Sequence, residues 1–338
     1  MTKPLLTTDV PRIRIGVSSC LLGELVRHDG GHRRDRYLTD MLGSFFEWVP
    51  VCPELEAGMG VPREAVHLEQ SQGQMRLVGV RSGADHTEAM LDYAPRRLDE
   101  LVTADLSGYI LKKDSPSCGL IRVRVHQGRG QVTRTGRGLF AAALAERCPT
   151  LPIEEEGRLN DEPLRENWIN RVFAYRRLQN LWNTRWSQGD LIRFHTSHKL
   201  VLLAHSPSAY QALGRLVADA KPRSRSEVRD QYERAFMAAL TRLTSRGRHC
   251  NVLHHMFGYV SDQIDDGSRR ELIDAIEDFR REYVPLAAPL TLVAHHARRL
   301  GVDYLMGQVY LAPHPKELDG VPDGSIPRSP RGMIVSRE

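Results

Sequence analysis

Three of the five cysteines occupy the same kind of place in the sequence. Cys20 ends the segment GVSSC, Cys52 ends VPVC and Cys118 ends SPSC, and each follows an apolar stretch that reads as a strand. Ligands of an open parallel sheet bind outside the carboxyl ends of its strands, so these thiols could converge there. Three thiolates suit zinc with an open position, or an iron–sulfur cluster with one iron lacking a protein ligand. Three buried cysteines that merely act as small apolar side chains are the alternative.

Polar side chains crowd the same three turns, which a purely structural edge would not require. They are Ser18, Ser19, Asp29, Glu54, Lys112, Ser115 and Ser117. Glycine and proline residues accompany them, as tight turns around a cofactor need. Cys148 and Cys250 match no motif, and we expect them to pack in the interior.

The first 150 residues read as strands that alternate with helices. Strands are expected at 13–20, 47–54, 75–80, 107–118 and 121–127, the last as an edge strand or a hairpin arm. Helices are expected around 37–46, 85–104 and 136–147. This alternation predicts an α/β domain with a Rossmann-like, mostly parallel sheet.

The second half carries apolar stripes at helical spacing and no comparable strand pattern. Helices are expected at 164–182, 225–246, 250–264, 269–283 and 289–311. We place the boundary in the acidic stretch 154–163, which gives a site-bearing domain at 1–157 and an all-α domain at 158–338 with a loose tail after Pro313. The histidine pairs 254–255 and 295–296 do not form two-point ligand sets, because neighbours on a helix point about 100° apart.

Composition narrows the class of protein. The 47 Lys and Arg residues exceed the 42 Asp and Glu residues, for a formal charge of +5. This mild excess fits a phosphate-bearing ligand or nucleic acid, but also a surface rich in ion pairs. An odd, sparse set of cysteines argues against a disulfide framework. No long apolar run and no signal-peptide pattern are present, so we expect a cytoplasmic protein that does not enter a membrane.

Three blocks of the first half carry a specific resemblance. CLLGELVRHDGG at 20–31, VCPELEAGMGVPRE at 51–64 and LKKDSPSCG at 111–119 are similar, in order and spacing, to the signature blocks of the thiouracil desulfidase family (DUF523). The helical half resembles a second uncharacterised domain, DUF1722 (YbgA-like), that is often fused behind it. Together the two resemblances cover nearly the whole chain.

The resemblance implies a cofactor and a reaction. Members of this family hold a [4Fe-4S] cluster with three cysteines, which match Cys20, Cys52 and Cys118, and leave one iron open for the sulfur of a thiolated pyrimidine. The reaction is non-redox: the thiocarbonyl becomes a carbonyl and sulfide leaves. The implied substrates are 2- or 4-thiouracil and 4-thiouridine monophosphate, with uracil or UMP as product.

The same blocks suggest roles for the polar side chains. Glu54 is the candidate general base and proton shuttle, with salt-bridge or cap duty as its structural alternative. Ser115 and Ser117 are the further catalytic candidates, against ordinary turn chemistry. The candidate substrate-binding residues are Ser19, Arg27, His28, Asp29 and Lys112. His28 stands where relatives commonly have Tyr, and GMGVPRE resembles the long, fused form.

Two other functions compete with the desulfidase. The same three thiols could hold zinc, or they could form a sensor whose basic helical half docks nucleic acid or a partner protein. We expect a small-molecule substrate, a monomer or a homodimer, and no nucleic-acid partner for the enzyme. Radical chemistry with S-adenosylmethionine is disfavoured, because it usually takes its cluster cysteines from one CxxxCxxC loop, which is absent.

Overall fold

The computed structural model describes residues 13–221 and 223–318, which divide into two compact units. The first comprises the described residues up to Asn160 together with 315–318, and the second runs from Asp161 to His314. Residues 1–12 and most of the expected loose tail lie outside the described residues. No helix in the described part of the chain has both the length and the apolar character needed to cross a membrane.

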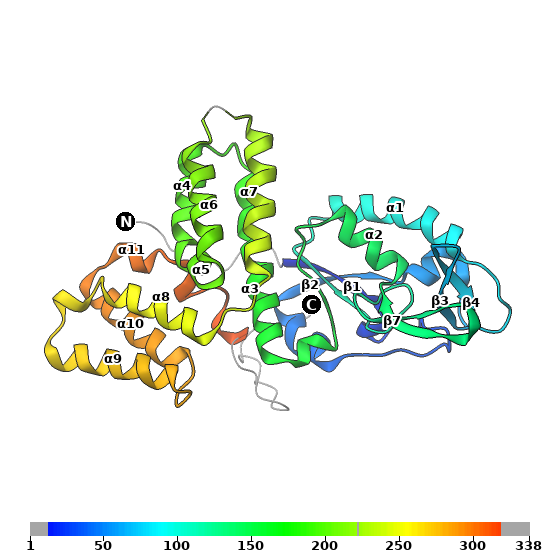
Figure 1. Cartoon of the computed structure of the whole chain (residues 1–338), viewed down its shortest axis with the longest axis horizontal. Coiled ribbons are helices and arrows are strands. Elements are labelled where there is room, and N and C mark those ends of the chain that lie inside the picture. The colour runs from blue at the N-terminus through cyan, green and yellow to red at the C-terminus, as the bar shows by residue number, and fades with distance from the viewer. Residues whose placement is uncertain (1–12, 222, 319–338) are drawn as a thin grey trace, which may run out of the picture. The chain divides into compact units, whose positions relative to one another are not determined.

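The core of the first unit is a parallel sheet of four strands (Figure 1). Its order is β2 (Phe46–Val51), β1 (Ile13–Ser18), β5 (Gly108–Leu111) and β8 (Ile153–Glu155). Every residue of β5 is buried, as is typical of a strand covered on both faces. The prediction of a parallel α/β sheet is therefore confirmed.

Two helices cover one face of this sheet, α1 (Thr87–Thr103) and α2 (Leu139–Arg147) (Figure 1). The ring of Phe140 in α2 packs against Tyr109 of β5 and Tyr93 of α1, with centroids 6.4 and 6.1 Å away. Tyr109 also lies flat over Gly16 of β1, where an added Cβ atom would come within 2.2 Å of the ring. The sheet and its helices thus share one closely packed core.

A second, mixed sheet was not expected from the sequence. Its order is β4 (Gln74–Gly79), β3 (Val66–Ser71), β6 (Val123–His126) and β7 (Val132–Gly136). The segment predicted at 121–127 is a hairpin arm, as one alternative had it, but β6 lies between β3 and β7 and is not an edge strand.

Several predicted elements are shorter than expected. The strand predicted at 107–118 ends at Leu111, because Asp114 takes a left-handed φ of 58° and Pro116 follows. The helix predicted around 37–46 is two short helical segments, Tyr37–Met41 and Leu42–Ser44. The other short helical segments of this unit are Ser19–Leu22, Leu55–Met59, Gly128–Gly130, Arg158–Asn160 and Lys316–Leu318.

The second unit is helical throughout its described residues, as predicted. Its longer helices are α3 (Glu162–Trp182), α4 (Gln188–Ser197), α5 (Lys199–His205), α6 (Pro207–Ala218), α7 (Arg225–Leu240), α8 (Arg246–Phe257), α9 (Asp266–Arg280), α10 (Ala287–Leu300) and α11 (Asp303–Met306). Two short turns, Ser261–Gln263 and Val309–Leu311, complete it. Two apolar cores hold these helices, one around Trp182, Tyr232 and Phe236 and one around Leu253, Ile276 and Val293.

Candidate active site

The carboxyl ends of β1, β2 and β5 meet at one edge of the parallel sheet. Ser18 pairs in register with Val51, and Val17 pairs with Ile110. The three segments that carry the cysteines leave the sheet from this edge. Cys52 follows β2 directly, but Cys20 lies two residues after β1 and Cys118 seven residues after β5, so neither ends its strand as predicted.

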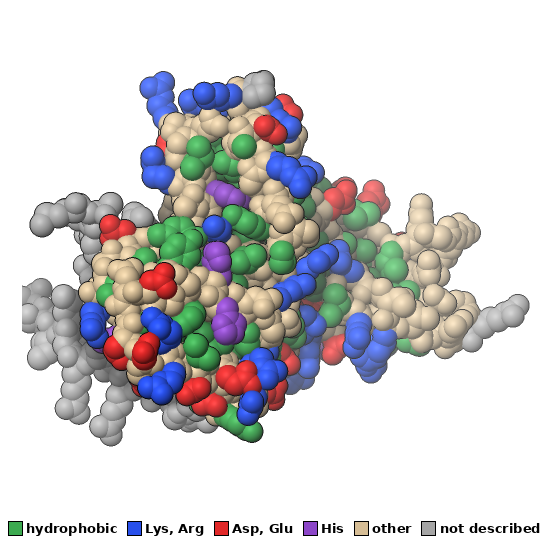
Figure 2. Space-filling view, turned by 60° about the vertical axis from the view of Figure 1, so that its left-hand side comes forward, with side chains coloured by type: hydrophobic (Ala, Val, Ile, Leu, Met, Phe, Trp, Pro, Cys, Tyr) green, Lys and Arg blue, Asp and Glu red, His purple; other side chains and the backbone are tan. Residues whose placement is uncertain are grey.

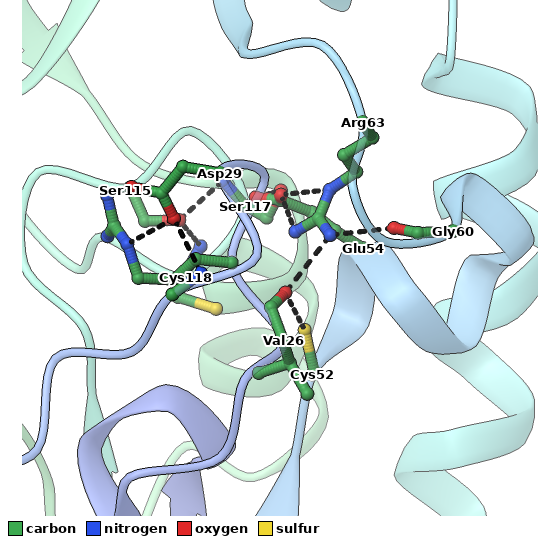
Figure 3. A network of polar contacts seen from close by, with 11 residues as sticks. Val26, Asp29, Cys52, Glu54, Gly60, Arg63, Ser115, Ser117 and Cys118 are labelled. Atoms are coloured by element: carbon green, nitrogen blue, oxygen red, sulfur yellow. Dashed lines mark hydrogen bonds and ion pairs between the residues drawn. The ribbon is translucent and has the colours of Figure 1, made fainter.

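A cavity of about 390 Å³ opens at this edge, and all three cysteines line it. Its size lies within the range of small-molecule sites. Figure 3 shows the sulfur atoms of Cys52 and Cys118 turned toward the same space. Cys148 and Cys250 do not line it, and all five cysteines are free of disulfides. The structure therefore brings together the three cysteines that the sequence singled out.

Burial dominates the protonation of these three thiols. It raises the pKa of Cys20 to about 11, and the neighbouring Cys52 raises it further. Burial likewise raises the pKa of Cys52 and takes that of Cys118 well above its usual range. Lys112 and Arg27 oppose the shift at Cys20, and a hydrogen bond from Ser18 opposes it at Cys118. Three buried thiolates would thus need a cation among them, and bound metal supplies one.

The donor set fits an iron–sulfur cluster. Within the described residues, no three His, Cys, Asp or Glu side chains come together closely enough to hold a metal ion between them. A cluster makes a different demand, because each thiolate binds a different iron and the sulfurs need not meet at one point. Soft thiolates around one cavity, with Ser18 next to Cys118, match that demand in chemistry.

Glu54 also lines the cavity, two residues after Cys52, and both of its oxygens are held. The guanidinium of Arg63 donates to Oε2 from Nε at 3.0 Å and from Nη2 at 2.5 Å. The hydroxyl of Ser117 donates to Oε1 at 2.9 Å (Figure 3). The carboxylate therefore has a fixed orientation at the cavity wall. It takes part in a salt bridge, as its structural alternative foresaw, and it faces the site as well.

The sequence analysis assigned no role to Arg63, which joins several parts of the site. Besides Glu54, it donates from Nη1 to the carbonyls of Val26 at 3.0 Å and Gly60 at 2.9 Å. The Cys52 thiol contacts the same Val26 carbonyl at 3.7 Å. The only available signal was its place in the VPRE block, because many other arginines have no such role.

The two serines near Cys118 have different positions. Ser117 is fully buried and does not line the cavity; it acts on the site through Glu54. Ser115 lines the cavity, and its hydroxyl accepts hydrogen bonds from the backbone N–H of Ser117 at 3.3 Å and of Cys118 at 3.0 Å. Ser115 thus shapes the turn that presents Cys118, which is the turn chemistry weighed as its alternative.

Lys112 lines the cavity beside a buried acidic partner that the sequence analysis did not name. Its ammonium group forms an ion pair with Glu156, which also accepts the backbone N–H of Lys113 at 2.7 Å. The backbone N–H of Lys112 donates to the Ser18 hydroxyl at 3.0 Å. The acidic stretch expected to be a domain linker therefore supplies part of this site's wall.

The remaining substrate-binding candidates come from the segment after Cys20. Ser19, Arg27 and His28 line the cavity, whereas Asp29 does not. Asp29 accepts the backbone N–H of Gly31 at 3.0 Å and pairs with Arg27 at 3.4 Å. These contacts lower the pKa of Asp29, the Gly31 hydrogen bond first. Asp29 therefore shapes its own turn and orients Arg27.

A parallel α/β sheet with three cysteines around a cavity at its carboxyl edge, joined to a helical unit, is the class of protein that this fold and site define. Residues 15–156 match the family described as 2-thiouracil desulfurase, and residues 199–315 match the one described as protein of unknown function (DUF1722). The chain belongs to the 2-thiouracil desulfurase family, in a form that also carries a DUF1722 domain.

Two curated proteins are similar to parts of this chain. "Uncharacterized protein YbgA" of Escherichia coli is 31% identical over 162 residues, which cover 48% of this chain and 96% of that protein. "Uncharacterized protein YbbK" of Bacillus subtilis is 32% identical over 150 residues, 43% of this chain and 97% of that protein. A solved structure of a "[4Fe-4S]-dependent thiouracil desulfidase TudS" is 31% identical and covers 46% of this chain and 98% of its own, with a TM-score of 0.37.

Proposed function

We propose that this chain is a desulfidase that hydrolyses the carbon–sulfur bond of thiolated pyrimidines and releases sulfide. The observation that carries the proposal is the convergence of Cys20, Cys52, Cys118 and Glu54 on one cavity. Membership of the 2-thiouracil desulfurase family supports the same reaction class. Candidate substrates are 2- and 4-thiouracil and 4-thiouridine monophosphate.

A [4Fe-4S] cluster is the cofactor proposed here, with Cys20, Cys52 and Cys118 as its ligands. When bound, it would supply an iron that lacks a protein ligand and acts as a Lewis acid toward a soft sulfur. Neighbouring hydroxyls and cations tune such centres. Ser18, Arg27 and Lys112 lie at the right places to do so, since each acts on one of the cysteines.

Glu54 is the group proposed to handle protons. Its carboxylate would accept a proton from the attacking water and later return it to the departing sulfide, so that one water replaces one sulfur without net oxidation or reduction. Arg63 and Ser117 fix the direction of the carboxylate. Arg27 and His28, on the opposite side of the chain's loop from these groups in sequence, line the same cavity and are available to the substrate.

Anaerobic reconstitution with iron and sulfide tests the proposal. Cys20→Ser, Cys52→Ser and Cys118→Ser should each lose the brown colour near 400 nm and the release of sulfide from thiouracil. Cys148→Ser and Cys250→Ser are matched controls and should keep both. Equal behaviour of all five variants would remove the ligand assignment, and a colourless zinc-loaded protein that releases sulfide would favour the zinc alternative.

The sensor alternative stays a prediction, as do the cytoplasmic location and the monomeric or dimeric state. Binding of oligonucleotides by the full chain, weakening steeply with salt, would support docking by the helical half. Absence of binding at about 50 mM salt would count against it.

A further inference from the structure

A cluster of aromatic and basic side chains lies in the second unit, apart from the cysteine site. Five different elements contribute to it: α4, α5, α6, α8 with the turn after it, and α11. Its members are His195, Lys199, Tyr210, His255, Tyr259 and Tyr304. Figure 2 shows a row of histidine side chains, with a basic side chain among them, on the face of this unit turned to the viewer.

The ammonium group of Lys199 lies between two tyrosine rings. It is 5.8 Å from the ring centroid of Tyr210 and 5.7 Å from that of Tyr304, within the range of cation–π attraction. Tyr259 stacks on Tyr304 with centroids 4.7 Å apart, and His195 stacks on Tyr210 at 5.7 Å. The rings therefore fix the position of the charge.

No carboxylate in the described part of the chain forms an ion pair with Lys199. Its charge reaches the neighbouring histidines instead. Burial lowers the pKa of His195 and of His255, and the positive charge of Lys199 lowers both further. The cluster is thus a centre of uncompensated positive charge, which favours an anion.

Hydrogen-bond donors around Lys199 point to the kind of anion. The Tyr304 hydroxyl is buried and has no hydrogen-bond partner within the described residues. His195 uses Nδ1 on the Tyr232 hydroxyl at 3.1 Å, which leaves Nε2 for another contact. Tyr259 is 36% exposed, so the cluster is open to solvent. A phosphate group, with close to two negative charges and several acceptor oxygens, matches one lysine surrounded by neutral donors.

We propose that Lys199, Tyr210 and Tyr304 form a second binding site, which takes the phosphate group of inorganic phosphate or of a nucleoside monophosphate. The site lies wholly within the helical unit and does not depend on the desulfidase reaction. Lys199 supplies the charge, and the tyrosine hydroxyls supply neutral donors. The stacked rings of Tyr259 and Tyr304 lie beside the charge, where a planar base could pack.

Titration of the full chain with sodium phosphate, uridine monophosphate and uridine, at constant ionic strength and followed by calorimetry, tests the proposal. Wild type should bind phosphate saturably. Lys199→Met keeps the apolar stem and removes the charge, so it should weaken phosphate binding by about tenfold or more. Lys221→Met, at an exposed lysine of the same unit, is the matched control and should bind as wild type does.

A second variant guards against misfolding at Lys199. Tyr304→Phe keeps the ring and removes only the buried hydroxyl, and it should weaken phosphate binding several-fold at an unchanged unfolding temperature. Uridine monophosphate that binds more tightly than phosphate, with the gain lost in Lys199→Met, would assign the site to nucleotides; equal affinity would assign it to the free anion. Absence of saturable phosphate binding, or equal binding by wild type and both variants, would overturn the proposal.

Discussion

Arg63 holds one oxygen of Glu54 from two nitrogens, and Ser117 holds the other. The guanidinium is 7% exposed and the carboxylate 14%, so solvent screens this pair little. A bidentate contact of this kind fixes orientation as well as charge. Arg63 is therefore a positioning residue for the proposed proton-transfer group, and it acts without itself lining up with the thiols.

Replacing Arg63 should separate orientation from charge. Arg63→Lys keeps a cation but loses the fork, and we expect kcat to fall by about 10- to 100-fold with little change in KM, since a misplaced catalytic group costs about that much. Arg63→Gln should fall further. Sulfide release from thiouracil under anaerobic conditions measures both constants.

The matched control is Arg147→Gln, which removes an exposed ion pair with Asp99 in the same unit. Such pairs contribute at most about 1 kcal/mol, so activity should not change. Iron content should be measured for every variant, because Arg63 also contacts the Val26 carbonyl beside Cys52. Full activity of Arg63→Lys would contradict the positioning role.

Glu54 itself is open to a direct test. Glu54→Gln keeps the size of the side chain and its contact with Ser117, but it cannot accept a proton from water. We expect iron content near that of wild type and a loss of kcat of about 100-fold or more, the range of general acid–base catalysis. Glu64→Gln, whose carboxylate instead accepts the backbone N–H groups of Arg81 and Ser82, is the matched control. A fully active Glu54→Gln would remove Glu54 from the mechanism.

Close packing between β1 and β5 yields a prediction about stability. A methyl group at Gly16 would meet the Tyr109 ring at 2.2 Å, and that ring is itself pinned by Phe140. Gly16→Ala should therefore lower the free energy of unfolding by about 1–3 kcal/mol, the usual cost of overpacking. Gly128→Ala meets no atom within 4 Å and should change it by less than about 0.5 kcal/mol. Denaturant unfolding followed by circular dichroism compares the two variants, and equal stabilities would refute the packing argument.

The sequence was sufficient to place the three cysteines at one edge, because strand periodicity and the topology of parallel sheets are both local or general rules. It could not reveal β3 and β7, since Val66–Ser71 and Val132–Gly136 contain few apolar residues and depend on pairing with each other's neighbours. The overlong strand before Cys118 has a similar cause, because only the left-handed backbone at Asp114 shows where β5 has already ended.

The wall of the site was harder to foresee than its thiols. Arg63 and Glu156 act through partners far along the chain, such as Val26 and Lys112, and burial selects them from many residues of the same type. Asp29 and Ser117 were singled out correctly as neighbours of the site, but their side chains serve Arg27 and Glu54 and do not line the cavity. Proximity in sequence to a ligand predicted location better than role.

His198 gives the helical unit a pH-dependent stability. The ring is buried, and burial lowers its pKa to about 3, with the charge of Arg177 adding to the effect. Its Nδ1 donates to the Phe194 carbonyl at 2.8 Å, so the folded chain holds the neutral form. The unfolded chain, with a histidine pKa near 6.5, binds more protons below that pH, and stability therefore falls as the pH drops from about 6.5 toward 3. Between pH 6.5 and 5 this histidine should cost about 2 kcal/mol.

The change His198→Gln removes that titration while keeping a donor near Phe194. We expect the variant to be less stable than wild type at pH 7.5, and its free energy of unfolding to depend less on pH between 7 and 5. Some slope should remain, since burial also lowers the pKa of His249, to about 4. His254→Gln, at an exposed position of the same unit, should keep the slope of wild type. Urea unfolding at a series of pH values gives the slopes, and identical slopes for wild type and His198→Gln would mean that His198 is protonated in the folded chain.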